Sequence, residues 1–100
     1  MPATPSDLVD LERDRRRATA DLIAFSDRVS AERWALFPAP EQWAERATWP
    51  PEQADELERL RGAERELVLA IHRHPAVQRA LADHTYSELD RTVRATAAER

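Results

Sequence analysis

The sequence predicts an all-α protein, a small helical bundle built on two long amphipathic helices. Three observations predict it. The chain contains one glycine, no segment alternates apolar and polar residues as a strand does, and two long segments repeat apolar residues at every third or fourth position. At 100 residues, we expect one helical domain spanning residues 1–100, with a modest core.

The first long helix is expected from Thr4 to Val29. Thr4 can cap its start, Pro5 suits the first turn, and Asp7 faces the positive end of the helix dipole. Val9 and Ile23 widen its apolar stripe, as in a helix that touches more than one neighbour. The stripe is a heptad seam in which one residue is charged: Leu8, Leu11, Arg15, Ala18, Leu22, Phe25 and Val29.

A connection rich in tryptophan and proline follows at about residues 34–51. Ser30 is a possible new cap, Ala31 to Phe37 a short turn of helix, and Pro40 another helix start. This much apolar surface predicts an ordered segment, because flexible linkers contain few large apolar side chains. The rings are either a surface for a protein partner or a cap on the open end of the core. They are four of the six aromatic residues in the chain: Trp34, Phe37, Trp43 and Trp49.

The second long helix is expected from Pro51 to His74, where Pro75 ends it. Gly62 lies inside it and predicts a close approach of another helix. Two short helices follow, with a capping box from Thr85 to Glu88 between them, and the tail at about 96–100 is expected to fray. The seam of this helix again contains one charged residue: Leu57, Leu60, Glu64, Leu67 and Ile71.

The two seam charges suggest how the long helices pair. If these helices form an antiparallel hairpin, Arg15 and Glu64 can pair across it and set the bundle register. The alternative is that both side chains extend to the edge of the apolar stripe and reach solvent. Two unsatisfied seams of this length also predict a homodimer.

Acid–base chemistry would have to come from Glu64, His84, Tyr86 and Glu88. A desolvated Glu64 would have a raised pKa and could shuttle protons. Capping explains Glu88 equally well, and Tyr86 fits a packing position. His72, His74 and His84 are poor metal ligands, because i,i+2 spacing places two side chains on different faces of a helix. We expect no metal and no cofactor.

Composition narrows the classes of function. The chain has no cysteine, no signal-peptide apolar region and no apolar run long enough for a membrane span, so we expect a cytoplasmic protein with no membrane partner. The net charge of -4 makes nucleic acid an unfavourable partner. Four arginines form a local exception, but acidic residues one helical turn away predict a solvated, salt-bridged face. The arginines are Arg13, Arg15, Arg16 and Arg17, and the acids are Asp10, Glu12, Asp14 and Asp21.

The residue pattern resembles a group of small helical actinobacterial proteins of unassigned activity. The shared features are a proline-rich start leading into an Asp-Leu-Val/Ile-x-Leu helix, a connection containing tryptophan, and a last helix that opens with Tyr-x-x-Glu. Here they are Pro5, Asp7, Leu8, Val9 and Leu11, then the tryptophan connection, then Tyr86, Ser87, Glu88 and Leu89. The resemblance implies an architecture and no catalytic residue. In size and helical character the chain is also similar to the lysinoalanine-forming tailoring proteins of lanthipeptide gene clusters, without an aligned motif.

Three functions follow as expectations. The first is a non-catalytic interaction or scaffold protein that contacts a protein or peptide through the tryptophan-rich connection. The second is a small helical enzyme, similar to the tailoring proteins, that acts on a peptide or small molecule by acid–base chemistry. The third is a DNA-associated regulator that uses the arginine face, which the net charge and the missing helix-turn-helix disfavour.

Overall fold

The computed structural model describes residues 4–99, which form five α-helices and one short 3-10 helix, without a strand. The predicted all-α class is confirmed. Prolines mark the starts of several elements, as expected for a residue that suits the first helical turn. The elements are α1 (Ser6–Leu36), η1 (Pro40–Gln42), α2 (Trp43–Ala47), α3 (Pro51–Arg73), α4 (Pro75–Ala82) and α5 (Tyr86–Ala98).

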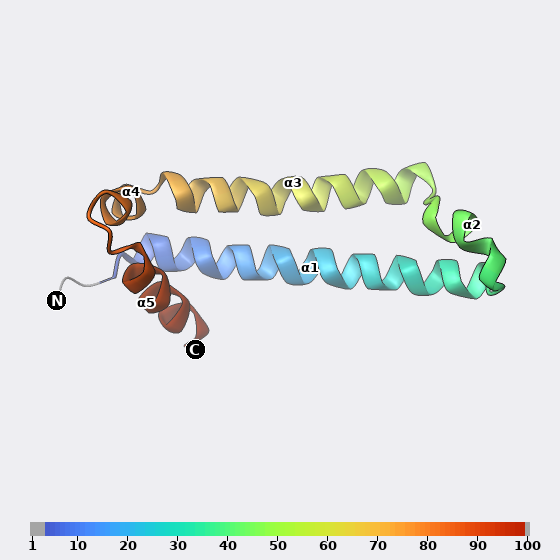
Figure 1. Ribbon diagram of the computed structural model, residues 1–100, viewed down its shortest axis with the longest axis horizontal. Helices are drawn as coiled ribbons and strands as arrows, with labels where there is room; N and C mark the ends of the chain where they lie inside the picture. Colours follow the sequence, from blue (N-terminus) through green and yellow to red (C-terminus); the bar gives the residue numbers. More distant parts are fainter. Residues whose placement is uncertain (1–3, 100) are drawn as a thin grey trace.

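The molecule is a long layer of two helices with smaller elements at each end. Figure 1 shows α1 and α3 side by side, with the chain running in opposite directions along them. η1 and α2 join them at one end, and α4 and α5 pack at the other. The molecule measures 58 × 25 × 21 Å and has a radius of gyration of 18.4 Å, against about 13 Å for a compact domain of this length. Most of the layer therefore extends beyond the part that α4 and α5 cover.

The main buried cluster lies at one end of this layer, and Val29 of α1 is buried separately, nearer the connection. Leu8, Val77 and Val93 form a buried cluster where α1, α4 and α5 meet. Val9 on α1 and Ala97 on α5 are also buried. By contrast, α3 contributes no fully buried residue. Its seam is half-buried, because a layer of two helices covers each seam from one side only.

The first helix differs from its prediction at both ends. It begins at Ser6, with Pro5 at the N-cap and no capping side chain, so the predicted cap by Thr4 is wrong. The backbone N–H of Leu8 instead donates to Asp7 Oδ1 at 2.9 Å. The predicted restart at Ser30 is also wrong, because α1 continues to Leu36. No proline or glycine interrupts the segment before Pro38.

The last two helices are separate, as predicted, but the turn between them is built differently. Thr85 is the N-cap of α5, yet its side chain accepts no hydrogen bond, so the predicted capping box does not form. His84 has φ of 60°, in the left-handed region that commonly ends a helix. The N–H of Thr85 donates to the carbonyl of Ala80 at 2.8 Å and closes α4.

Two smaller expectations also fail. α5 remains helical through Ala98 where a frayed tail is predicted, because Arg13 on α1 donates to the carbonyls of Thr96 (3.2 Å), Ala97 (3.5 Å) and Glu99 (3.4 Å). Arg100 lies outside the described residues. Gly62 marks no close approach, since a Cβ built there meets no atom within 4 Å. Within residues 4–99, none of the helices combines the length and hydrophobicity that a membrane crossing requires.

Candidate functional site

The four aromatic residues of the connection fall into two pairs. Trp34 and Trp43 are 56% and 69% exposed, whereas Phe37 and Trp49 are half-buried. Trp49 packs edge-on against Phe25 of α1, with ring centroids 6.2 Å apart and planes at 69°. Trp49 is therefore packed against α1, as the prediction of a covered ring requires, and Trp34 and Trp43 are exposed, as the predicted partner surface requires.

Arg46 covers one of the two exposed indoles and follows the other along α2. Its guanidinium lies over the ring of Trp34, 3.9 Å from the centroid, which is a cation–π contact. Arg46 also follows Trp43 by three residues on α2, so both side chains lie on one face of that helix. We refer to Trp34, Trp43 and Arg46 as the connection surface.

Two arginines hold the connection in one conformation. Arg46 donates to the carbonyls of Phe37 and Ala39, both at 2.7 Å, and of Pro40 at 3.3 Å. Arg33 on α1 donates to the carbonyls of Glu45 and Thr48 at 2.6 and 2.8 Å and lies over the ring of Phe37. Of these carbonyls, that of Ala39 also accepts from the N–H of Gln42 at 3.0 Å. The arginines supply further donors in a segment that is too irregular to pair all of its backbone groups. The connection is thereby fixed to the end of α1.

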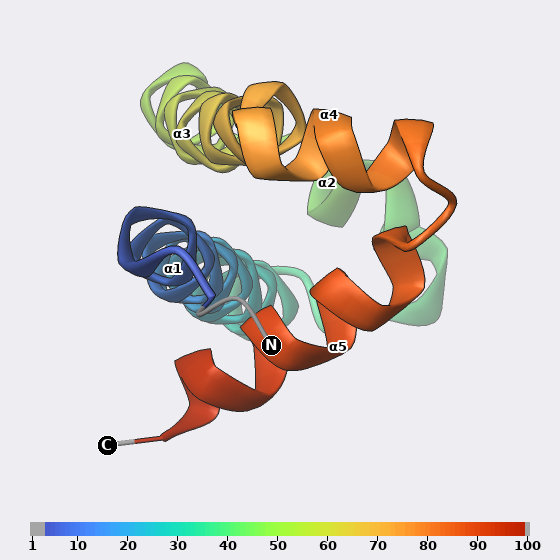
Figure 2. The ribbon, with the colours of Figure 1, turned by 90° about the vertical axis from the view of Figure 1, so that its left-hand side faces the viewer.

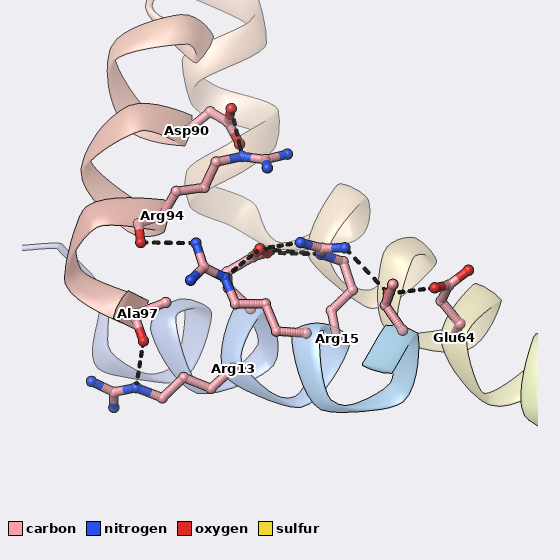
Figure 3. A network of polar contacts seen from close by, with 9 residues as sticks. Arg13, Arg15, Glu64, Asp90, Arg94 and Ala97 are labelled. Atoms are coloured by element: carbon pink, nitrogen blue, oxygen red, sulfur yellow. Dashed lines mark hydrogen bonds and ion pairs between the residues drawn. The ribbon is translucent and has the colours of Figure 1, made fainter. Parts of the chain in front are cut away.

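The two seam charges do not pair directly. Arg15 forms its ion pair with Glu12, at 2.5 Å between Nη2 and Oε1, because Glu12 lies one turn away on the same helix. Glu64 instead accepts a hydrogen bond from the hydroxyl of Thr19. Arg15 reaches the same hydroxyl at 3.5 Å. Thr19 therefore bridges the two predicted register residues. Figure 3 shows Arg15 and Glu64 close to each other without a direct contact.

Glu12 is the residue that sequence reasoning missed. The sequence pattern predicts a solvated acid, yet Glu12 is 5% exposed, beneath α5 and between two arginines. Hydrogen bonds from Arg15, and more weakly from Arg16, hold its pKa below the usual glutamate range despite the desolvation. One feature of the sequence does indicate this burial. Glu12 follows Val9 by three residues, so it extends the face of the helix that Val9 widens.

The arginine cluster of α1 is occupied by intramolecular contacts. Arg13 holds the end of α5, and Arg16 donates to the carbonyl of Arg94 at 3.0 Å. Arg94 in turn pairs with Asp90 at 3.0 Å. Of the four arginines, Arg17 is the most exposed, and it pairs with Asp14 at 3.6 Å. These contacts join α1 to α5. They engage most of the guanidinium groups that could otherwise bind a phosphate backbone.

The four proposed acid–base residues lie apart. Glu64 is bonded to Thr19 in the middle of the layer, and His84 lies in the turn after α4. Tyr86 lines a cleft of about 280 Å³ among α1, α3, α4 and α5, together with Glu12 and Asp90. Glu88 lines a different cleft, formed by Pro5 and residues of α4 and α5. The structure therefore does not assemble these four groups into one site.

The histidine side chains also lie at separate positions in the structure. His74 Nδ1 accepts from the N–H of Ala76 at 3.0 Å and caps α4. Its Nε2 lies 3.0 Å from Asp7 Oδ2, and this hydrogen bond lowers the pKa of Asp7. His72 borders the same cleft as Tyr86. In the described part of the chain, no three His, Asp or Glu side chains group as ligands for a metal ion.

Comparison with known proteins adds no function to this geometry. The resemblance to small helical actinobacterial proteins stays a prediction, as does the cytoplasmic location. The connection surface is accordingly interpreted from its own contacts. No protein-family model, curated protein or solved structure matches the chain.

Proposed function

We propose that this protein is a non-catalytic scaffold that holds a protein or peptide partner at the connection surface. The observation that supports the proposal is the exposure of Trp34 and Trp43 on a segment that Arg33 and Arg46 hold in place. Exposed tryptophan and arginine side chains are the residue types most often found at binding hot spots. A surface ordered before binding loses little further conformational entropy when the partner arrives.

The chemistry of the surface favours an apolar partner with hydrogen-bond acceptors. The two indole faces offer apolar contact area, and each indole N–H is a donor without an acceptor function. The guanidinium of Arg46 already bonds three carbonyls and covers Trp34, so it supports the indoles and is not a free charge. In this proposal the α1–α3 pair is an antiparallel hairpin that acts as a stiff arm behind the surface.

The catalytic alternative has weaker support. Its four candidate residues lie in different places, and the most buried carboxylate is that of Glu12. Because arginines lower the pKa of Glu12, this group is ionised near neutral pH and has no proton to donate as a general acid. The DNA-binding alternative is weakened in the same way, since Arg13, Arg15 and Arg16 are engaged within the chain.

Replacing one indole tests the proposal. The tagged wild-type protein and Trp43→Ala would be compared for the proteins they retain from a lysate of the source cells, by quantitative mass spectrometry. We expect a stoichiometric partner whose recovery falls at least about tenfold with Trp43→Ala, since a hot-spot side chain contributes about 2 kcal/mol or more.

The matched control is Leu69→Ala, which removes an apolar side chain that is 39% exposed on α3. It should retain the partner at the wild-type level. Circular dichroism would confirm that both variants remain helical. Equal recovery of every retained protein with wild type and Trp43→Ala would contradict the proposal.

A further inference from the structure

The end of the molecule that carries the connection surface is acidic. Segment 32–56 contains six acidic residues and two arginines, so it has the whole net charge of -4, whereas the rest of the chain has 13 residues of each sign. We refer to this segment as the acidic end. Figure 1 places it at the opposite end of the layer from α4 and α5. Its acidic residues are Glu32, Glu41, Glu45, Glu52, Asp55 and Glu56.

The negative charges of the acidic end are exposed, and its positive charges are not. Arg33 and Arg46 are half-buried, and their guanidinium groups donate to backbone carbonyls of the connection. By contrast, every acidic residue of this end except Glu56 is exposed. Within residues 4–99, Glu56 is also the only one of the six that forms an ion pair, with Arg59. A partner that approaches this end therefore meets unpaired negative charge.

The aromatic rings of the same region show which chemical group they accept. Arginine guanidinium groups of the chain itself lie over three of them: Arg28 over Phe25 at 5.2 Å from the centroid, Arg33 over Phe37 at 4.8 Å, and Arg46 over Trp34 at 3.9 Å. In the described part of the chain, no cation lies over Trp43, although its side chain is 69% exposed. Tryptophan is the side chain that binds a cation best in this way. The ring of Trp43 is thus free to accept a cation from outside the chain.

We infer that the partner is a basic segment of a protein or peptide, which places an arginine or lysine side chain over the ring of Trp43. This inference rests on the proposed function. The acidic end attracts a positively charged segment before contact, and the cation–π interaction then fixes one of its side chains. The apolar stem of such a side chain packs against an indole, and the backbone carbonyls of the segment accept from the indole N–H. A basic segment therefore supplies the apolar and acceptor groups that the connection surface favours.

The short α2 helix gives such a segment room to bind. Figure 2 shows the η1–α2 segment to one side of the α1–α3 layer, and among the described elements α2 contacts η1 and α1 alone. Glu41 and Glu45 are four residues apart and lie on one side of this segment, with Trp43 on the other. A helix is about 10 Å wide, a distance that about three extended residues span. One basic segment that crosses α2 can therefore reach both Trp43 and the two carboxylates.

A synthetic peptide tests the sign of the charge. The probe is a fluorescein-labelled peptide of about ten residues that alternates arginine with alanine, and its control contains citrulline, which resembles arginine in shape but has no charge. Fluorescence anisotropy measures the binding of each peptide to the wild-type protein. At low salt, the arginine peptide should bind at least about tenfold more tightly than the citrulline peptide. The difference should shrink at about 0.15 M salt, where the Debye length is about 8 Å.

Charge variants test whether the acidic end is responsible. Glu41→Gln/Glu45→Gln should weaken binding of the arginine peptide at about 0.15 M salt at least about threefold. The matched control, Asp21→Asn/Glu66→Gln, removes the same charge from two exposed residues outside the acidic end. Asp21 precedes Trp34 by 13 residues on α1, which is about 20 Å and more than two Debye lengths. This control should bind the peptide as the wild type does.

Two substitutions of Trp43 separate a cation–π interaction from apolar contact. Trp43→Phe keeps an aromatic face, whereas Trp43→Leu keeps apolar volume without one. The arginine peptide should bind Trp43→Leu at least about threefold more weakly than Trp43→Phe. Because Trp43 is largely exposed, both variants should retain the circular dichroism spectrum of the wild type.

Four results would each overturn the inference. They are no saturable binding of the arginine peptide below about 1 mM, equal affinity for the arginine and citrulline peptides, equal binding by the two double variants, and equal binding by Trp43→Phe and Trp43→Leu. A lysate partner that Trp43→Ala loses, combined with any of these results, keeps the proposed function and rejects only the basic partner. Equal lysate recovery with wild type and Trp43→Ala rejects the proposed function itself.

Discussion

The single glycine of the chain is a local weakness of α3. A Cβ at Gly62 would meet no atom within 4 Å, and the residue is in the interior of a long helix. Gly62→Ala should therefore raise the free energy of unfolding by about 1 kcal/mol, through the helix propensity of alanine alone. Urea denaturation followed by circular dichroism measures it. The neighbouring Ala63→Gly should show the opposite change, and a loss of stability in Gly62→Ala would contradict an explanation from helix propensity alone.

The backbone conformation of His84 gives this residue a structural role, which is separate from its predicted role in acid–base chemistry. Its left-handed backbone, with φ of 60°, is unfavourable for most side chains and costs glycine nothing. We expect His84→Gly to raise the midpoint of thermal unfolding, by the equivalent of about 0.5–1 kcal/mol. His84→Ala keeps the steric penalty and should bring no such gain. Destabilisation by His84→Gly would show that the imidazole itself stabilises the turn.

Glu12 should make stability depend on pH in the acidic range. Because Arg15 lowers its pKa in the folded protein, the Glu12 contribution is present above the ordinary value of 4.5 and is lost as the pH falls through that value toward the folded pKa. Glu12→Gln should be less stable at pH 7, by about 2 kcal/mol, and the difference from wild type should shrink below pH 4.5. Denaturation at a series of pH values measures it. Asp14→Asn, at an exposed pair, should stay close to wild type throughout.

At the scale of elements, α5 depends on a residue of α1 for its C-terminal end. Arg13 donates to three carbonyls at this end, and of these, in the described part of the chain, only that of Thr96 also accepts a backbone N–H, from Glu99. The last carbonyls of a helix lack regular intrahelical donors. In Arg13→Ala, the amides of residues 95–98 should exchange with deuterium several times faster, while those of α3 stay protected. Arg17→Ala removes an exposed arginine of the same helix and serves as the control. Unchanged exchange at the end of α5 would show that the apolar contacts of Ala97 suffice.

Local patterns predict these elements well and their packing poorly. Pro51 and Pro75 place the boundaries of α3 correctly, because a proline restricts the backbone whatever surrounds it. The burial of Glu12 could not be derived in this way, since α5 covers it from some eighty residues further along the chain. Similarly, Trp49 and Trp43 are the same type of residue, yet Trp49 packs against Phe25 and Trp43 is exposed to solvent. Which ring is covered depends on the path of the connection, which Arg33 and Arg46 determine.

At the scale of the whole molecule, elongation explains why so much of the seam is half-exposed. Two helices of this length produce a layer, and α4 and α5 are long enough to cover only one end of it. The predicted seam is real along both helices, but the monomer alone cannot complete its burial.

The contact between Arg13 and the carbonyl of Ala97 joins residues 84 positions apart, and this has a consequence for the order of folding. Closing so long a loop in an unfolded chain carries a large entropic cost before any contact compensates for it. Pairing of α1 with α3 shortens the effective loop, because it returns the chain from the distant connection to the beginning of α1. The α1–α3 layer should therefore form first. The contacts of Leu8 with Val77 and Val93 should form only in the last kinetic step of folding.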